Sequence, residues 1–101
     1  PLGVVGFCFG GNVAYTLATQ SRVVVTAGFY PGGVGEVNNP EAPMHWTSDI
    51  HGHVLLLYGE NDPLIPEAHR LATQAELQLQ GISHEMVVYP QVGHGFFCDA
   101  R

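Results

Sequence analysis

The sequence predicts an α/β fold in which helices flank a parallel β-sheet. Short apolar runs of strand length alternate along the chain with segments of helical periodicity, and this order is typical of β-α-β units. The apolar runs are continuous rather than alternating, as in strands that are covered on both faces. With 101 residues, of which 46% are hydrophobic and 12% are charged, the chain is long enough for one small folded domain.

The first predicted unit begins with a strand at residues 4–7, which is followed by a helix at residues 12–20. The apolar residues expected to pack this helix on the sheet are Val13, Ala14, Leu17 and Ala18. A second strand covers residues 23–28 and ends at a turn, Phe29-Tyr30-Pro31-Gly32-Gly33. Two strands joined by a helix indicate a right-handed parallel crossover.

Residues 32–52 lack clear periodicity, and we expect a loop there with one short helix near residues 44–49. A second unit follows, with a strand at residues 54–58, a helix at residues 66–80 and a strand at residues 83–89. The residues at helical spacing on this second helix are Ala68, Leu71, Ala72, Ala75 and Leu79. The two units together predict four parallel strands.

The composition argues against several classes of partner. Three Lys and Arg residues stand against nine Asp and Glu residues, a formal net charge of -6, so we expect neither nucleic acid nor membrane surfaces as partners. The apolar runs are too short to span a membrane, and we expect a cytoplasmic protein. Two cysteines, Cys8 and Cys98, are too few for a disulfide framework. The chain enters a core-type strand without an initiator Met, as expected for a piece of a longer chain.

The segment Gly6-Phe7-Cys8-Phe9-Gly10-Gly11 lies between the first strand and the first helix. It matches the nucleophile elbow G-x-S-x-G with cysteine in place of serine, and we expect Gly6 and Gly10 where a Cβ would collide with backbone. The N–H of Phe9 is a candidate oxyanion donor, and the positive end of the following helix favours a thiolate at Cys8. The alternative is an inert, buried cysteine at a structural turn.

Two further loops after predicted strands carry the other residues of a possible triad. Asp62 follows the third strand in Gly59-Glu60-Asn61-Asp62-Pro63, and His94 follows the fourth in Gly93-His94-Gly95. Cys8, Asp62 and His94 therefore have the nucleophile, acid, histidine order of α/β-hydrolases, and the carboxyl ends of parallel strands gather such groups. A free thiol has a pKa of about 8.5, so a nearby imidazole raises its reactive fraction, and Asp62 would orient that imidazole.

Each of these residues has competitors. His45 and His69 are expected to face solvent, and His84 within a strand is expected to be structural. The pair His51-x-His53 resembles a fragment of a metal site, but no third ligand accompanies it at a suitable spacing, so we expect no metal.

The acid has alternatives too. Glu60 lies two positions before Asp62. Turn chemistry before Pro63 would also select an aspartate at position 62 without any catalytic role.

These motifs resemble the dienelactone hydrolase family of the α/β-hydrolase fold. The resemblance rests on residues 6–11, on residues 59–66 and on Gly93-His94-Gly95-Phe96-Phe97, and it covers nearly the whole chain. It implies that residues 1–101 are the C-terminal portion of a single α/β-hydrolase domain. It also implies a Cys8–His94–Asp62 triad that cleaves a small ester or lactone through a thioacyl-enzyme, without metal or organic cofactor.

The chain departs from the family pattern at several points. Family members have further strands before the elbow, and these bring the second oxyanion donor, a glutamate near the cysteine and an arginine for the substrate carboxylate. The expected partner of this chain is therefore a missing N-terminal segment of the same domain. Dienelactone-specific members carry a second arginine four residues after the histidine, where this chain has Cys98, and Arg101 lies three residues further on.

A second hypothesis is a non-catalytic α/β-hydrolase-fold module that binds a ligand or partner. A chain released from catalysis has no physical reason to retain Cys8, Asp62 and His94 in this order. The sequence therefore favours the hydrolase.

Overall fold

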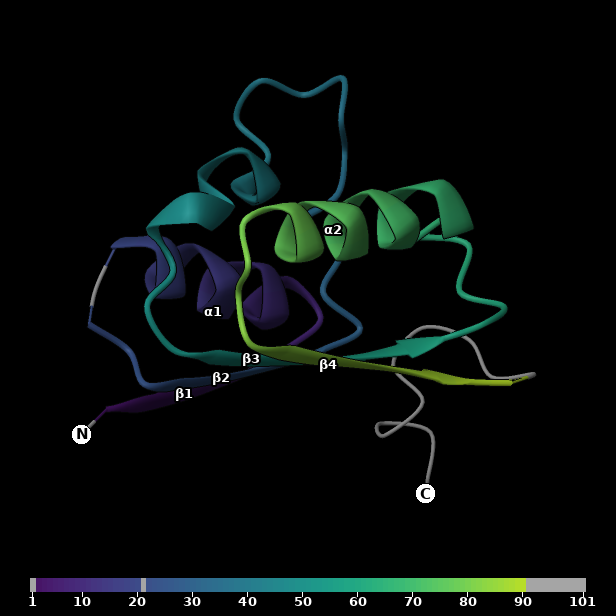
Figure 1. Cartoon of the computed structure of the whole chain (residues 1–101). Helices are drawn as coiled ribbons and strands as arrows, with labels where there is room; N and C mark the ends of the chain where they lie inside the picture. Colours follow the sequence, from purple (N-terminus) through teal and green to yellow (C-terminus); the bar gives the residue numbers. More distant parts are fainter. Residues whose placement is uncertain (1, 21, 91–101) are drawn as a thin grey trace.

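A four-stranded parallel β-sheet with helices packed on it makes up residues 2–20 and 22–90, the part of the chain that the computed structural model describes (Figure 1). The strands are β1 (Gly3–Phe7), β2 (Val25–Phe29), β3 (His53–Gly59) and β4 (His84–Tyr89). The helices are α1 (Phe9–Gln20), the 3₁₀ helix η1 (Pro43–Asp49) and α2 (Glu67–Leu79). Residues 91–101 lie outside the described part, and with them the predicted positions of His94, Cys98 and Arg101.

The strands lie in the order β1-β2-β3-β4, and every neighbouring pair is parallel. The predicted parallel units are therefore confirmed, and all four strands have their carboxyl ends at one edge of the sheet. The boundaries differ from prediction by one to three residues. The differences nearest the predicted site are that α1 begins at Phe9 rather than Asn12 and that β2 covers Val25–Phe29 rather than residues 23–28. The strand β2 continues to this residue because Phe29 still pairs in register with Phe7 on β1 and with Leu57 on β3.

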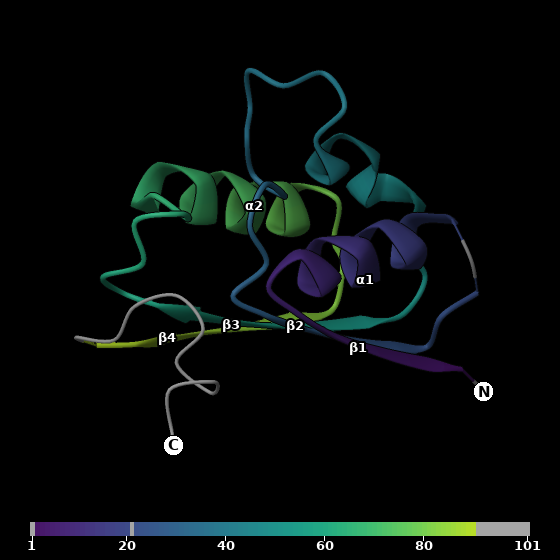
Figure 2. The ribbon, with the colours of Figure 1, turned by 180° about the vertical axis from the view of Figure 1, so that it is seen from behind.

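Both α-helices and η1 lie on the same face of the sheet, as two opposite views show (Figures 1 and 2). On the other face, the side chains of Val5, Phe7 and Val25 are 62%, 47% and 49% exposed. The expectation that the strands are covered on both faces is therefore wrong for the described residues. The strand order explains this, because right-handed crossovers that advance in one direction along a sheet place their helices on one face.

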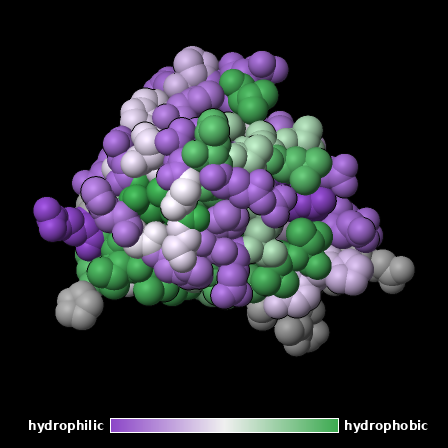
Figure 3. All heavy atoms as spheres, in the orientation of Figure 1, coloured by the Kyte–Doolittle hydropathy of each residue, from purple (hydrophilic) through white to green (hydrophobic). Residues whose placement is uncertain are grey.

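The face opposite the helices, which we call the open face, carries apolar side chains in register. Val5 pairs with Ala27, and Phe7 pairs with Phe29, whose ring it stacks on at a centroid distance of 4.6 Å. In the space-filling view, hydrophobic residues gather at the lower left and at the lower right, with hydrophilic residues between them (Figure 3). Within the described part of the chain, the sheet is thus a two-layer arrangement with an apolar outer surface.

The helix α1 packs on the sheet with small residues and one tyrosine. Its buried residues are Gly11, Ala14, Tyr15 and Ala18. This corrects the predicted face, because Val13 and Leu17 are 40% and 39% exposed. Small side chains allow the helix backbone to approach the strands closely, so the packed face follows shape as well as hydrophobicity.

The packed face of α2 also differs from the predicted one. Its buried residues are Thr73 and Leu77, whereas Leu71 and Leu79 are 49% and 76% exposed. The burial of Thr73 is compatible with its hydroxyl because that hydroxyl donates a hydrogen bond to the carbonyl oxygen of His69 at 3.1 Å. Apolar spacing alone therefore chose the wrong side of this helix.

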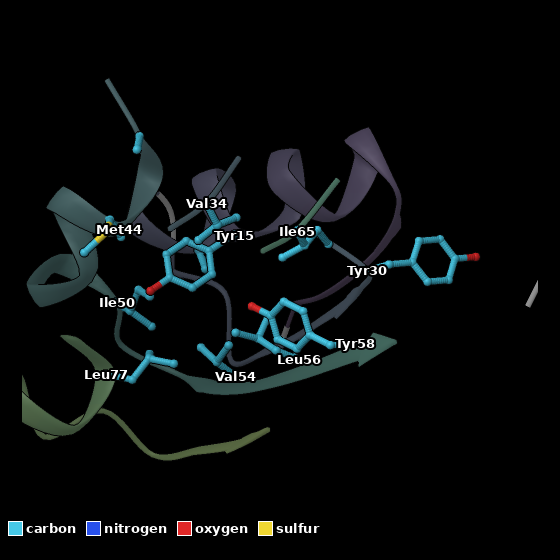
Figure 4. Close-up of a cluster of buried hydrophobic side chains, with 12 residues drawn as sticks. Tyr15, Tyr30, Val34, Met44, Ile50, Val54, Leu56, Tyr58, Ile65 and Leu77 are labelled. Atoms are coloured by element: carbon cyan, nitrogen blue, oxygen red, sulfur yellow. The ribbon is translucent and has the colours of Figure 1, made fainter. Parts of the chain in front are cut away.

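The core between helices and sheet is built around Tyr15 of α1 and Tyr58 of β3 (Figure 4). The Thr47 hydroxyl on η1 donates to the carbonyl oxygen of Met44 at 2.7 Å, so the Tyr15 hydroxyl is the donor in its 2.6 Å bond to Thr47. Burial raises the pKa of Tyr15 to about 12, and burial also raises the pKa of Tyr58. The expected short helix is thus confirmed as η1, which covers the end of the core.

Candidate active site

Cys8 stands directly after β1 with a left-handed backbone, at φ 57°. Its N–H donates to the carbonyl oxygen of Phe29 at 3.0 Å, and its own carbonyl oxygen accepts from the N–H of Gly11 at 2.9 Å. A non-glycine residue in this region costs roughly 1–3 kcal/mol, and such strain persists only where the surroundings impose it. This sharp strand-to-helix turn is the geometry predicted for a nucleophile elbow.

The glycines of the elbow have different roles. A Cβ on Gly6 would overlap the carbonyl group of Gly10, so Gly6 is required there, as predicted. A Cβ on Gly10 would meet no described atom within 4 Å, and the expected collision at Gly10 is therefore not found in this part of the chain. The close approach instead involves Gly11, whose Cβ would lie 3.0 Å from the Cα of Pro31.

The amino-terminal end of α1 lies beside the candidate nucleophile. The helix begins at Phe9, immediately after Cys8, so its positive end acts on the thiol more directly than a helix that begins at Asn12. The Phe9 side chain is 79% exposed, and its N–H belongs to the first turn, where N–H groups have no partner within an α-helix. Phe9 is therefore positioned at the correct end of the helix for an oxyanion donor.

Asp62 lies in the loop after β3, at the same edge of the sheet as Cys8, and is only 4% exposed. Its Oδ1 accepts a hydrogen bond from the N–H of Leu64 at 2.9 Å, the side-chain turn that the alternative interpretation requires. The loop before it is joined to β4, because the N–H of Glu60 donates to the carbonyl oxygen of Tyr89 at 2.9 Å. Glu60 is exposed, so burial favours Asp62 over Glu60 as the carboxylate of a shielded site.

His94 lies outside the described residues. A triad base is expected in a loop that directly follows a strand, and none of the other five histidines lies in such a loop. His84 has the structural position predicted for it, since its Nδ1 is 2.7 Å from the carbonyl oxygen of Ile82. His45 is exposed, as expected. His69 was expected to face solvent, but it is partly buried, and its Nδ1 has no partner among the described residues. This burial arises because α2 turns its His69 side toward the loop before η1, where His69 and Glu36 line one cavity.

The remaining pair, His51 and His53, does not form a metal site in the described part of the chain. His53 Nδ1 is 2.7 Å from the Ser83 hydroxyl, and its Nε2 is 4.0 Å from Glu85. Among the residues that the structure describes, there is no group of three or more metal-ligating side chains. No helix within those residues is long and apolar enough to cross a membrane.

Sequence reasoning missed two residues next to the elbow. Tyr30 directly follows β2, as Cys8 directly follows β1, and it has a left-handed backbone of φ 40° and a fully buried side chain. Asn12, on the first turns of α1, donates from Nδ2 to the carbonyl oxygen of Gly32 at 2.9 Å. The available signal was the turn sequence after β2, whose strand neighbours the elbow, together with a poor helix former at position 12.

A cavity of about 380 Å³ lies at the opposite end of α1 from Cys8. Its lining residues are Thr16, Thr19, Gln20, Glu41, Pro43, Trp46 and Asp49. It belongs to the surface between α1 and η1 rather than to the edge that carries Cys8 and Asp62.

A family model described as "Dienelactone hydrolase family" matches residues 1–101. The chain belongs to this family. Among curated relatives, "Putative carboxymethylenebutenolidase" of Synechocystis sp. is 35% identical over 102 residues, and the protein of the same name from Escherichia coli K12 is 30% identical over 103 residues. These matches cover 99% of this chain but 42% and 38% of the relatives, so the chain spans about two fifths of their length.

Solved structures give the same fold. The crystal structure of a "Putative Dienelactone Hydrolase" from Klebsiella pneumoniae matches with a TM-score of 0.88 at 32% identity, over 99% of this chain and 43% of that chain. An acylaminoacyl peptidase of Pyrococcus horikoshii matches with a TM-score of 0.82 at 15% identity, over 97% of this chain and 20% of that chain, which shows the fold alone. The predicted fold class is confirmed: this member of the dienelactone hydrolase family has part of an α/β-hydrolase domain.

Proposed function

We propose that the protein to which this chain belongs hydrolyses small carboxylic esters or lactones with Cys8 as its nucleophile. The observation that carries the proposal is the left-handed Cys8, held between the end of β1 and the start of α1 in a dienelactone hydrolase family chain. This turn presents a thiol to substrate at the strand edge and places it beside the positive end of a helix. An inert structural cysteine has no need of either property.

In the proposed mechanism, His94 removes the thiol proton and the Cys8 sulfur attacks the ester carbonyl carbon. The N–H of Phe9 stabilises the oxyanion, and the tetrahedral intermediate collapses to a thioester while His94 protonates the departing alcohol. Water, activated by His94, then releases the carboxylic acid and restores the thiol. Asp62 keeps His94 in the productive tautomer, and its burial supports this role because a shielded carboxylate interacts strongly with an imidazolium. The mechanism needs no metal or organic cofactor.

The open face supports a further part of the proposal, that another segment of the same domain completes the site. Exposed Val5, Phe7 and Val25 are unusual in a sheet of this type, and the relatives are more than twice as long as this chain. We propose that a preceding segment covers this face and supplies the second oxyanion donor. A cysteine nucleophile must also stay in its reduced form, and the cytoplasm is a reducing compartment, so we propose a cytoplasmic location.

The substrate is proposed to be a small ester or lactone that need not carry a carboxylate. In the sequence, Cys98 occupies the position at which dienelactone-specific members of the family carry an arginine, and a guanidinium–carboxylate pair is a strong, directional contact. Neutral esters are therefore expected to compete well with carboxylated ones.

The test is turnover of a chromogenic small ester by the full-length protein. Cys8→Ala should reduce kcat to the level left by binding and oxyanion effects, while the control Cys98→Ala should retain most of the wild-type rate. If Cys8→Ala keeps the wild-type kcat/KM, another residue attacks. If the wild-type protein turns over no ester or lactone, the non-catalytic module becomes the better interpretation.

A further inference from the structure

The turn after β2 is pressed directly against the first turns of α1. A Cβ on Gly11 would lie 3.0 Å from both Cα and Cβ of Pro31 and 3.1 Å from the carbonyl oxygen of Phe29. The same carbonyl oxygen of Phe29 accepts the N–H of Cys8. The elbow and this turn are therefore in contact at Cys8 and again at Gly11.

Asn12 adds a side-chain hydrogen bond to this contact. Its Nδ2 donates to the carbonyl oxygen of Gly32 at 2.9 Å, a part-buried bond between residues far apart in sequence. The next residue, Gly33, has φ +81°, and a Cβ there would lie 3.0 Å from the same Nδ2. The turn thus leaves room for the Asn12 amide where a larger residue at position 33 would crowd it.

Asn12 is not explained by its helix. Asparagine is a poor helix former, and at this position its side chain does not cap α1, because the helix begins at Phe9. Its described side-chain contact leads out of the helix to the neighbouring turn. The strained backbone of Cys8 in turn needs restraint from outside the elbow, because an isolated left-handed cysteine would relax.

We propose that Asn12 is a positioning residue for Cys8. By joining the first turns of α1 to the turn after β2, its amide holds the helix end and the left-handed Cys8 in one fixed relation. Without the hydrogen bond from Asn12 to Gly32, the Cys8 thiol can move away from the positive end of α1. This movement lowers the reactivity of the thiol and worsens its alignment with substrate. The effect on kcat rests on the proposed function, whereas the effect on thiol reactivity does not.

The experiment uses the full-length protein with Cys98 replaced by Ser, so that Cys8 is the thiol of this segment that is followed. The variants are Asn12→Leu, which is nearly isosteric but cannot donate, and Asn12→Ala, which cannot clash. Asn12→Gln keeps an amide donor on a longer side chain. Thr16→Val is the matched control, because the Thr16 hydroxyl donates to the carbonyl oxygen of Asn12 at 2.9 Å on the same helix without reaching the turn.

The first readout is the rate of iodoacetamide alkylation of the Cys8 peptide against pH, followed by mass spectrometry. Asn12→Leu and Asn12→Ala should move the midpoint of this profile upward by about half a pH unit or more, because the thiolate loses part of its helix-end stabilisation. Asn12→Gln should restore part of the difference. Thr16→Val should leave the midpoint unchanged.

The second readout is ester hydrolysis. Asn12→Leu and Asn12→Ala should lower kcat by about tenfold with KM within about twofold, because alignment of the nucleophile is lost and substrate binding is not. An unchanged alkylation midpoint in both Asn12 variants overturns the inference, even if the melting temperature falls, because that result describes a purely structural residue. An equal shift in Thr16→Val overturns it as well. If wild-type protein lacks esterase activity, the proposed function fails, and the alkylation profiles still decide the role of Asn12.

Discussion

Cys8 and Tyr30 directly follow the neighbouring strands β1 and β2, and both have a left-handed backbone, at φ 57° and 40°. Their preceding residues, Phe7 and Phe29, are register partners, so the two left-handed residues lie next to each other at one edge of the sheet. Tyr30 also extends the sheet, because its N–H donates to the carbonyl oxygen of Leu57 at 2.6 Å. Strain at two adjacent positions is typical of a functional edge rather than of an ordinary parallel sheet.

At this scale the two elbow glycines make a sharp comparison. Gly6→Ala places a Cβ against the carbonyl group of Gly10, so it should destabilise the protein by about 3 kcal/mol or more and abolish activity. Gly10→Ala lies in α1 with open space around it in the described part of the chain, and it should be neutral or stabilising by up to about 1 kcal/mol. Urea unfolding of the full-length variants measures both. A tolerated Gly6→Ala would mean that the elbow adopts another backbone.

The choice of acid gives a second prediction at the residue scale. Asp62→Asn should retain the fold, because its amide oxygen still accepts from the N–H of Leu64, while kcat falls by several orders of magnitude. Glu60→Gln, at an exposed position of the same loop, should change kcat by less than about threefold. Steady-state kinetics on both variants decides the assignment. Wild-type rates in Asp62→Asn would transfer the role to Glu60 or to another segment.

At the scale of elements, the helix α1 contacts both the elbow at Cys8 and the 3₁₀ helix η1. Its first turns hold the elbow, and its Tyr15 reaches across to η1 through the hydrogen bond with Thr47. The sequence predicted this helix, but it placed exposed Val13 and Leu17 on the packed face. Periodicity identifies a helix, whereas the packed face depends on how closely the backbone can approach a sheet whose shape the sequence does not display.

The buried tyrosine leads to a prediction on alkaline stability. Tyr15 has a pKa of about 12 in the folded protein against about 10 when unfolded, so the stability from its neutral form is complete below pH 10 and is lost as pH rises toward 12. Up to pH 11 the loss should be on the order of 1 kcal/mol, about one unit of the pKa difference. Tyr15→Phe should reduce this alkaline sensitivity while costing about 1 kcal/mol at neutral pH, since Thr47 loses its donor.

Urea unfolding between pH 8 and pH 11 measures this effect. Tyr89→Phe, on β4 and 38% exposed, is the matched control for removal of a phenol hydroxyl outside the core. Part of the sensitivity should remain in Tyr15→Phe, because burial also raises the pKa of Tyr58. Equal pH profiles for Tyr15→Phe and wild type would show that Tyr15 ionises freely in the folded state.

At the scale of the whole molecule, the sequence predicted the parallel sheet but did not predict the open face. Continuous apolar runs correctly indicated parallel strands, and the order β1-β2-β3-β4 agrees with the predicted units. The same runs also predicted cover on both faces, which the described residues do not provide. A sequence reports that a strand is apolar all round, but it does not report which segment covers each side.

The candidate site was predicted in part. Cys8 and Asp62 were placed correctly at one edge, because each follows a strand and parallel strands end together. The hydrogen bond from Asn12 to Gly32 and the left-handed Tyr30 were not predicted, since each depends on how the turn after β2 meets α1. His94 stays a prediction, because it lies outside the described residues.

The open face predicts the behaviour of a polypeptide limited to these 101 residues. It should associate rather than remain a stable monomer, because Val5, Phe7 and Val25 present an apolar surface to water. Its kcat for ester hydrolysis should also be about 10² to 10³ times lower than that of the full-length protein, because one oxyanion donor is lost. Light scattering after size-exclusion chromatography measures the association, and Val5→Lys should reduce it. A monomer with full esterase turnover would overturn both the open-face and the second-donor proposals.

The all-parallel order also determines when the nucleophile can form during folding. Gly3 pairs with Val25, Val25 with His53 and Val54 with His84, so each pairing closes a loop of about 20 to 30 residues. Such non-local pairings form slowly, because the entropy of loop closure is lost before the contacts are gained. The carbonyl group that holds Cys8 belongs to Phe29, so a nascent chain cannot set the elbow until β2 has been synthesised and has paired. Until then Cys8 is an ordinary thiol on a flexible chain, and reactivity arises only with the completed sheet.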